Sequence, residues 1–488
     1  MPEKPNIVLV FPDQHRADVM GCAGNPVAQT PNLDKLASEG VLFKRCNTNS
    51  PLCMPARTSV ITGQYVSEHG VWSNNINGNE KGPSHVRSIR DAGYHTAVLG
   101  KTHLYTHGRR HTDEGKQILR DWGYTDIHEL TGPLASRAMD SPYTDYLERL
   151  GILETHRNYI ANHGRVMRDN MPWDYPACPL PTEAHLDSYT GREAVKWIQD
   201  YRGDKPFYYQ VCFPGPHDPY DAPAEYRARY RLDDLPLGII DPPGEPMSPL
   251  VSFFVNAYQS RTGIQNWTVE QRRLLKQGYY GKVTLIDYWV GEIMKALEQR
   301  HLLDNTWVIY TSDHGDMLGE RCLLQKMVFF EEAQLIPCII RPPDGVTGWE
   351  SNALTDQLDI IATLLDIAGA SSSIKPNGRS LIPQINAGPK NPGAHKGKEA
   401  IITEVFGFSA VRTERYKMSI DAKSLQPVEL YDLQEDPEER KNRVNDPSKA
   451  AVKKELSERY IQKLIDCRNE QLFLNYLEKD RIPRELRW

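Results

Sequence analysis

The chain has 488 residues, of which 39% are hydrophobic and 25% are charged, a composition typical of soluble globular proteins and unlike that of disordered chains. The chain has 58 Lys and Arg residues and 64 Asp and Glu residues. The resulting formal net charge of −6 gives no reason to expect nucleic acid or an anionic membrane as a partner. No apolar run approaches the ~20 residues that a membrane-spanning helix needs, and eight Cys residues are too sparse for a disulfide scaffold.

The first predicted element is a strand at Ile7–Phe11, a continuous β-rich run of the kind that is buried on both faces of a parallel sheet. This run follows the polar segment Met1–Pro5 and is too short for the apolar core of a signal peptide, so we expect a cytoplasmic protein with reduced cysteines. A helix is predicted next, with Thr30 as its cap, Pro31 in its first turn and Gly40 at its end.

Strands and helices are predicted to alternate along most of the remaining chain. Strands are expected at residues 96–99, 207–213, 307–311 and 338–341, and helices at residues 57–62, 189–201, 270–299 and 357–368. This alternation predicts an α/β fold with a doubly wound sheet, whose active site lies at the carboxyl ends of the strands. The stretch 105–183 is rich in His, Arg, Trp and Pro and lacks periodicity, as is typical of lids and binding loops.

The pattern changes after Pro383, where a linker rich in Pro, Gly and Lys spans residues 388–397. Short strands are predicted at residues 400–406, 409–412 and 417–420, followed by a helix at 448–467. We therefore expect two domains, a catalytic domain over residues 1–383 and a smaller antiparallel sheet with a packed helix over residues 384–488. The segment 472–488 carries apolar residues among charges, which fits docking on a second copy of the chain or packing on its own domain.

Two of the predicted strands end in side chains that can bind a cation. Ile7–Phe11 runs into Asp13 and Gln14, and the strand at 307–311 runs into Asp313 and His314. Because parallel strands end at one edge of a sheet, these side chains can converge on a divalent cation such as Ca²⁺ or Mg²⁺. Each pair taken alone also fits a helix cap or a turn.

A third feature is the string Cys53-Met54-Pro55-Ala56-Arg57. Pro55 fits the first turn of a helix, which would leave Cys53 at the helix N-terminus, where backbone amides and the helix dipole favour an anion. The string therefore predicts a nucleophile beside an anion-binding helix end. The alternative is a small buried cysteine that precedes a helix.

With this string, the sequence resembles the type I, formylglycine-dependent sulfatase family of the alkaline phosphatase superfamily, in which the Cys of such a motif is oxidised to formylglycine. The resemblance covers nearly the whole chain. Besides the Cys53 motif it is carried by Thr30–Asp34, Gly100–His103, Gly215–Pro219, Ser312–Gly315, Lys326 with Phe330 and Glu331, Gly378–Leu381, Leu430–Leu433 and Asp436–Glu438. It implies an alkaline-phosphatase-like mixed or parallel sheet flanked by helices, and hydrolysis of a small-molecule sulfate monoester to an alcohol and inorganic sulfate.

The resemblance also implies a metal site and a maturation partner. The metal ligands would be Asp13, Gln14, the oxidised Cys53, Asp313 and His314, with Ca²⁺ the first expectation and Mg²⁺ or Mn²⁺ as alternatives. Gln14 stands where the family often has Asp, so this site holds one negative charge fewer. A formylglycine-generating enzyme would convert Cys53.

Further residues around the reacting group take their roles from the same resemblance. Arg57 and Lys101 would hold the hydrated aldehyde, His103 would act as a base, and His217 and Lys326 would contact the sulfate, with His217 as the general acid. Asn74 would contact the same anion or simply form a loop. One hydroxyl of the hydrated, metal-bound formylglycine would attack sulfur, and deprotonation of the other would then release sulfate.

Two other functions are compatible with the sequence. A phosphonate monoester hydrolase or phosphodiesterase of the same superfamily also uses formylglycine and fits the pair Asp13 and Gln14, but that group typically carries uncharged Tyr and Thr in place of Lys101 and His103. A decayed protein that only binds sulfated ligands would not need to retain both Cys53 and His217. The leaving alcohol, whether aryl, alkyl, choline or sugar, is expected to be selected within residues 105–183.

Overall fold

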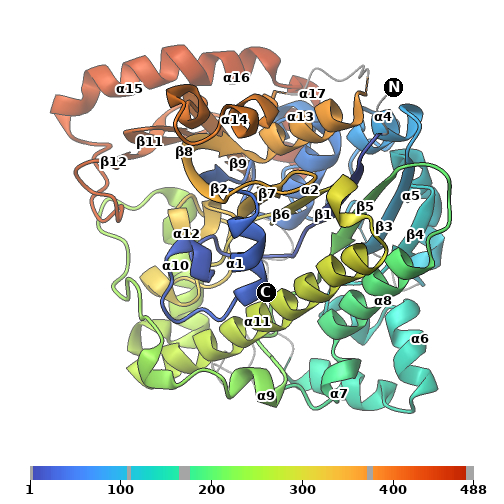
Figure 1. Ribbon diagram of the computed structural model, residues 1–488. Coiled ribbons are helices and arrows are strands. Elements are labelled where there is room, and N and C mark those ends of the chain that lie inside the picture. Colours follow the sequence, from blue (N-terminus) through green and yellow to red (C-terminus); the bar gives the residue numbers. More distant parts are fainter. Residues whose placement is uncertain (1–3, 107–110, 164–175, 371–376, 480–488) are drawn as a thin grey trace.

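The computed structural model describes residues 4–106, 111–163, 176–370 and 377–479 (Figure 1). Its centre is an eight-stranded sheet in the order β4-β3-β5-β1-β6-β7-β2-β8. The strands are β1 (Asn6–Val10), β2 (Val41–Asn47), β3 (His95–Gly100), β4 (Asp126–Glu129), β5 (Phe207–Cys212), β6 (Thr306–Thr311), β7 (Cys338–Arg341) and β8 (Trp349–Asp356). Every neighbouring pair is parallel except those that β7 makes with β6 and β2. The predicted α/β fold with a doubly wound, mixed sheet is confirmed.

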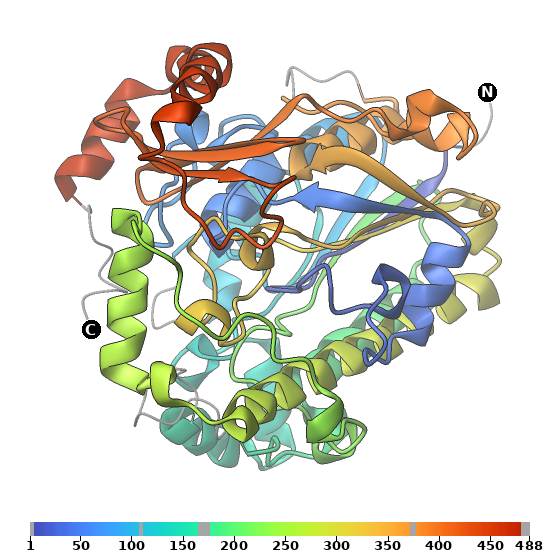
Figure 2. The ribbon, with the colours of Figure 1, turned by 90° about the vertical axis from the view of Figure 1, so that its left-hand side faces the viewer.

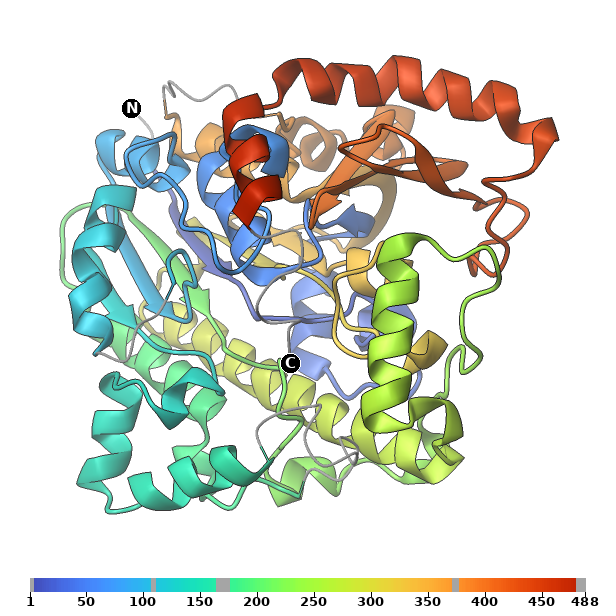
Figure 3. The same cartoon turned by 180° about the vertical axis from the view of Figure 1, so that it is seen from behind.

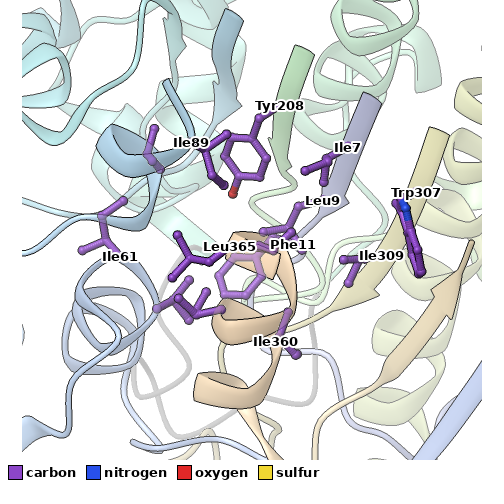
Figure 4. Packing of buried hydrophobic residues seen from close by; sticks show 14 of the residues in the cluster. Ile7, Leu9, Phe11, Ile61, Ile89, Tyr208, Trp307, Ile309, Ile360 and Leu365 are labelled. Atoms are coloured by element: carbon purple, nitrogen blue, oxygen red, sulfur yellow. The ribbon is translucent and has the colours of Figure 1, made fainter. Parts of the chain in front are cut away.

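Helices cover both faces of this sheet because its central strands are apolar on both sides. Ile7 and Leu9 of β1 pack with α2 (Cys53–Thr62), α4 (His85–Asp91) and α13 (Gln357–Ala368), as Figure 4 shows. Val8 and Val10 point the other way, toward α1 (Pro31–Ser38), α8 (Leu186–Asp200) and the long α11 (Val269–Gln299). Alternation of side chains along a strand produces these two layers, which fix the position of β1 at the middle of the fold.

A second sheet of four antiparallel strands lies beyond β8. It has the order β12-β11-β10-β9 and consists of β9 (Ala400–Val405), β10 (Phe408–Thr413), β11 (Tyr416–Asp421) and β12 (Pro427–Asp432). One face packs on a helical run formed by α15 (Ala450–Leu456), a π-helical turn (Ser457–Ile461) and α16 (Gln462–Cys467), the red helices outside the orange strands in Figure 2. The other face contributes Val405, Phe406, Ala410 and Tyr431 to a core shared with α10 (Pro249–Thr262) and α11.

The described part of the C-terminal segment packs on its own chain. α17 (Glu470–Lys479) places Phe473 and Tyr476 on Trp72, with ring centroids 5.2 and 6.0 Å apart, and lies beside the blue segment in Figure 3. Residues 480–488, which include most of the segment expected to dock on a second copy, lie outside the described residues. Among the described helices, none is long and apolar enough to cross a membrane.

Several local predictions were wrong for physical reasons. Thr30 occupies the N-cap position of α1 as predicted, but its side chain makes no capping hydrogen bond, because its hydroxyl accepts from the backbone N–H of Gly21 and donates to Asp34. α2 begins at Cys53 and not at Arg57, so the whole motif is helical. The predicted helix at 448–467 is interrupted by the π-helical turn. The sequence patterns also did not reveal β2, β4, β8, β12 or α10, while the division of the chain near Pro383 remains a prediction.

Candidate active site

The side chains predicted to bind a metal meet at the carboxyl edge of the large sheet. Asp13 follows β1, Asp313 and His314 follow β6, and Cys53 opens α2, and all four are buried. One donor atom from each of these residues lies within 4.8 Å of the donor atoms of the others. Two carboxylates, an imidazole and a sulfur therefore lie close together, although Cys53 and His314 are 261 residues apart in the sequence.

Cys53 contributes the sulfur atom of this cluster. Its Sγ atom lies 3.2 Å from Nε2 of His314 and 3.8 Å from Oδ1 of Asp13. Burial and the neighbouring Asp13 carboxylate raise the pKa of the Cys53 thiol to about 11. At neutral pH the unmodified side chain is thus a thiol, which is a poor nucleophile.

Hydrogen bonds from the second sheet hold the segment before Cys53 in place. The backbone N–H of Glu404 donates to the carbonyl of Asn49 at 3.0 Å, and the Asn49 amide donates to the carbonyl of Ile402 at 3.0 Å. The hydroxyl of Thr403 donates to the carbonyl of Thr48 at 2.8 Å. Strand β9 therefore fixes the chain that leads into the nucleophile.

His314 has the protonation state that a metal ligand requires. Its Nδ1 lies 3.0 Å from the carbonyl oxygen of Gly315 and donates to it, which leaves the Nε2 lone pair directed at Cys53. Burial lowers the pKa of His314 to about 4, so the ring is neutral at pH 7. Oδ1 of Asp313 accepts from the backbone N–H groups of Gln14 and His314 at 2.8 and 3.0 Å, which fixes this carboxylate.

Arg57 and Lys101 neutralise the carboxylates. Arg57 donates to Oδ2 of Asp313 at 2.9 Å and to Oδ2 of Asp13 at 3.0 Å, and the Lys101 ammonium lies 2.7 Å from the same Asp13 oxygen. Burial alone would raise the pKa of Asp13, but Lys101 and Arg57 hold it well below its usual range. Gly100 directly precedes Lys101, and only glycine fits at this position. Its φ is 103°, and a Cβ there would lie 2.0 Å from the Cys212 carbonyl oxygen.

His217 lies on a loop that a buried lysine supports. Its backbone N–H donates to the Asp13 carbonyl at 3.2 Å, and its Nδ1 lies 2.8 Å from the carbonyl oxygen of Asp218. Lys282 of α11 donates to the carbonyls of His217 and Pro219 at 2.9 and 3.0 Å. Burial, together with Lys326 and Lys101, lowers the pKa of His217 well below its ordinary value, so the free enzyme holds this ring neutral.

Lys326 belongs to a strained loop. Leu318, Arg321, Cys322, Gln325 and Met327 all have positive φ angles between 45° and 83°, a conformation that costs energy for residues with a side chain. The Lys326 ammonium donates to Oε1 of Gln14. Burial would lower the pKa of Lys326, but Cys53 and Asp13 raise it, so this loop presents a permanent cation to the cluster.

The amide of Gln14 is oriented by a residue that the sequence analysis missed. Its Nε2 donates to Oδ2 of Asp316, which also accepts from the Tyr220 hydroxyl at 2.6 Å, while Oδ1 of Asp316 accepts from the backbone N–H of Leu318 at 2.9 Å. A carboxylate can only accept, so the Gln14 oxygen must face Lys326 and the cluster. Asp316 stands two residues after His314, and that proximity to the motif was its only signal in the sequence.

Two of the predicted site residues, Asn74 and His103, remain to be described. Asn74 directs its Oδ1 to the backbone N–H of Met54 at 2.9 Å and thus caps the first turn of α2. His103 follows Lys101 by two residues and has a φ of 50°. Residues 107–110 and 164–175, within the stretch expected to select the leaving group, lie outside the described residues.

Comparison with known proteins identifies the family. The family model named Sulfatase matches residues 5–370, and the one named N-sulphoglucosamine sulphohydrolase, C-terminal, matches residues 319–466. An arylsulfatase of Clostridium perfringens is 29% identical over 78% of each chain, and a choline-sulfatase of Rhizobium meliloti is 28% identical over 91% of this chain and 83% of that protein. The crystal structure of a phosphonate monoester hydrolase of Agrobacterium radiobacter superposes with a TM-score of 0.78 at 25% identity, covering 96% of both chains.

The match to the sulfatase model spans most of the chain and includes both halves of the buried cluster. The fold is that of the alkaline-phosphatase-like sulfatases, and the relatives include enzymes named for arylsulfatase and choline-sulfatase activity. The protein therefore belongs to the sulfatase family of the alkaline phosphatase superfamily, and its activity is the hydrolysis of sulfate esters.

Proposed function

We propose that the chain hydrolyses a small-molecule sulfate monoester by means of a hydrated formylglycine that a maturation enzyme makes from Cys53. The observation that carries this proposal is the position of Cys53 inside the cluster of Asp13, Asp313 and His314. Burial and Asp13 keep the thiol protonated, so the unmodified cysteine is unsuited to attack sulfur. A hydrated aldehyde offers two hydroxyls on one carbon, one to attack and one to release the sulfate afterwards by losing its proton.

The donor set supports one divalent cation, with Ca²⁺ as the first candidate. Asp13, Asp313 and the Nε2 lone pair of His314 would hold it, together with the oxidised Cys53. An amide oxygen has two lone pairs, so Oε1 of Gln14 can accept from Lys326 and still serve as a neutral ligand. When bound, such a cation lowers the pKa of a hydroxyl that it contacts and makes it a better nucleophile at neutral pH.

The surrounding cations suit a substrate with exposed anionic oxygens. Lys101 and Lys326 would bind the sulfate, and Arg57 would hold the two carboxylates in place. His217 would protonate the leaving oxygen once the negative charge of the substrate has raised its pKa, and His103 would serve as the base for the second step. Asn74 would position the start of α2, and with it Cys53, by accepting from the backbone N–H of Met54.

A phosphonate monoester hydrolase is the second candidate, because the superposition with the Agrobacterium radiobacter enzyme covers nearly the whole chain. The choice can be tested with matured protein by comparing kcat/KM for nitrophenyl sulfate and for a phenyl phosphonate monoester. We expect the sulfate to be preferred at least about tenfold, since Lys101 and Lys326 add charge around the anion. A preference for the phosphonate would overturn the assignment.

Removal of divalent cations provides a separate prediction. Exhaustive chelation is expected to abolish turnover and to lower the melting temperature. Without the cation, less positive charge offsets the repulsion between the Asp13 and Asp313 carboxylates. Addition of Ca²⁺ should restore both, and titration with Mg²⁺ and Mn²⁺ would rank the three ions. Full turnover after chelation, with metal content verified by elemental analysis, would exclude a role for the cation.

A further inference from the structure

A second cluster of ligand-type side chains lies beneath the His217 loop and takes no part in the proposed reaction. It contains Cys178, His185 and Asp221, and one donor atom from each lies within 4.8 Å of the other two. Nε2 of His185 is 3.7 Å from Oδ1 of Asp221. The backbone N–H of Cys178 donates to the Asp221 carbonyl at 3.1 Å, which ties these two residues together.

The three residues come from separate segments. Cys178 precedes α8, His185 is the residue that caps the N-terminus of α8, and Asp221 ends the loop that carries His217. They line a cavity of about 20 Å³, together with Asp187 and Lys282 among others. A space of this size accommodates one ion or one water molecule.

The charge around the cavity favours a cation. Lys282 lies 3.5 Å from Oδ1 of Asp221 and 3.9 Å from Oδ2 of Asp187, so two buried carboxyl groups share one ammonium. With Cys178 bound as a thiolate, a divalent cation would bring the group to neutral charge, which reduces the penalty of burying it.

We propose that Cys178, His185 and Asp221 form a second metal site, distinct from the Cys53 cluster and selective for a borderline-soft divalent cation such as Zn²⁺. Sulfur, nitrogen and a single carboxylate oxygen form a ligand set typical of Zn²⁺, whereas Ca²⁺ prefers oxygen ligands throughout. Folding of the chain brings these three ligands together, and the site does not depend on the chemistry at Cys53.

Binding has a defined proton balance. The Cys178 thiol loses its proton to solvent as the sulfur–metal bond forms. In the metal-free protein, Nδ1 of His185 accepts from the backbone N–H of Asp187, so the ring proton is on Nε2. For Nε2 to bind a metal, that proton would have to move to Nδ1, which would give up the hydrogen bond from the Asp187 backbone N–H and turn toward Oδ2 of the same residue, 3.7 Å away in this structure.

The consequence of such a site is mechanical. The metal would join Cys178, near the end of the stretch expected to select the leaving group, to the loop that carries His217. Lys282 already connects this loop to α11 through the carbonyls of His217 and Pro219. Occupancy would therefore fix the distance between the substrate-selecting stretch and the general acid.

Co²⁺ is the probe for the test, because its complexes with thiolates absorb in the near ultraviolet. The full-length Cys53→Ser protein is titrated with Co²⁺, so that no thiol remains at the catalytic cluster. With the Asp13, Asp313 and His314 cluster first saturated with Ca²⁺, we expect Co²⁺ to produce the thiolate band with release of a proton, and Zn²⁺ to abolish the band. Introducing Cys178→Ser should remove the band, whereas Cys467→Ser, at an exposed position, should leave it unchanged.

A thermal measurement guards against a variant that fails to fold. Zn²⁺ is expected to raise the melting temperature of the Cys53→Ser protein, and His185→Gln should reduce that increase while circular dichroism stays unchanged. Absence of the thiolate band in the Cys53→Ser protein would overturn the proposal, and so would a band that survives Cys178→Ser. In either case the cavity would hold a water molecule and not a metal ion. Because Cys53 is absent throughout, neither result depends on the sulfatase mechanism.

Discussion

Replacing Cys53 by alanine is expected to reduce kcat for sulfate esters by at least about 10⁴-fold, the scale on which enzymes respond to the loss of a covalent nucleophile. The protein should remain folded, because Cys53 is a small residue at a helix N-terminus and its Sγ atom makes no contact that the fold requires. Before kinetics are measured, mass spectrometry of the Cys53 peptide should show the loss of mass that accompanies oxidation of the thiol to an aldehyde.

The control is Cys338→Ala, which removes another buried thiol, from β7, and should leave kcat unchanged. Cys53→Ser provides a sharper test, because serine can form a sulfate ester but has no second hydroxyl on the same carbon to expel it. A single turnover followed by arrest is the expected result. Sustained turnover by Cys53→Ala at more than a few per cent of the wild-type rate would refute the proposed chemistry.

Replacing Lys282 by methionine is expected to lower the free energy of unfolding by about 3–5 kcal/mol, the range observed when one partner of a buried ionic network is removed. The change leaves Asp187 and Asp221 without their ammonium and the carbonyls of His217 and Pro219 without a donor. Turnover should fall as well, because the loop that carries the general acid loses its connection to α11. Urea unfolding monitored by circular dichroism measures the first effect.

Lys295→Met is the matched control, since it lies on the same helix and makes one exposed ion pair with Glu292. Such pairs contribute about 0–1 kcal/mol, so this variant should unfold close to the wild-type midpoint. If the two variants unfold at the same urea concentration, the buried network does not stabilise the fold in the way that the contacts indicate.

The central strands could be predicted because they are buried on both faces and therefore appear as unbroken apolar runs. Ile7–Phe11 and Trp307–Thr311 have this pattern, and the flanking strands β5 and β7 are also buried throughout. Strand β8 lies at the edge of the sheet and alternates between exposed and buried residues at its start, so Glu350 and Asn352 interrupt any apolar run. Edge strands of this kind carry too little hydrophobic signal to be predicted from one sequence.

In the candidate site, too, residues in short sequence motifs could be predicted, whereas a residue whose partners are distant in the sequence could not. Asp13, Cys53, Asp313 and His314 stand in short motifs at element ends, and the structure brings these four together. Lys282 could not be found in this way, because it lies 65 residues from His217 in the middle of a helix whose neighbours give no hint of its partners. Its role arises only from the packing of α11 under the loop.

The hydrogen bonds between β9 and the segment before Cys53 have a consequence for the order of events during synthesis. Asn49 leaves the ribosome long before its partners Ile402 and Glu404, roughly 20 to 70 seconds earlier at about 5–20 residues per second. During that interval the segment before Cys53 lacks these hydrogen bonds, whereas in the finished protein Cys53 is only 1% exposed. The proposed oxidation of Cys53 is therefore expected to take place before the C-terminal sheet is complete.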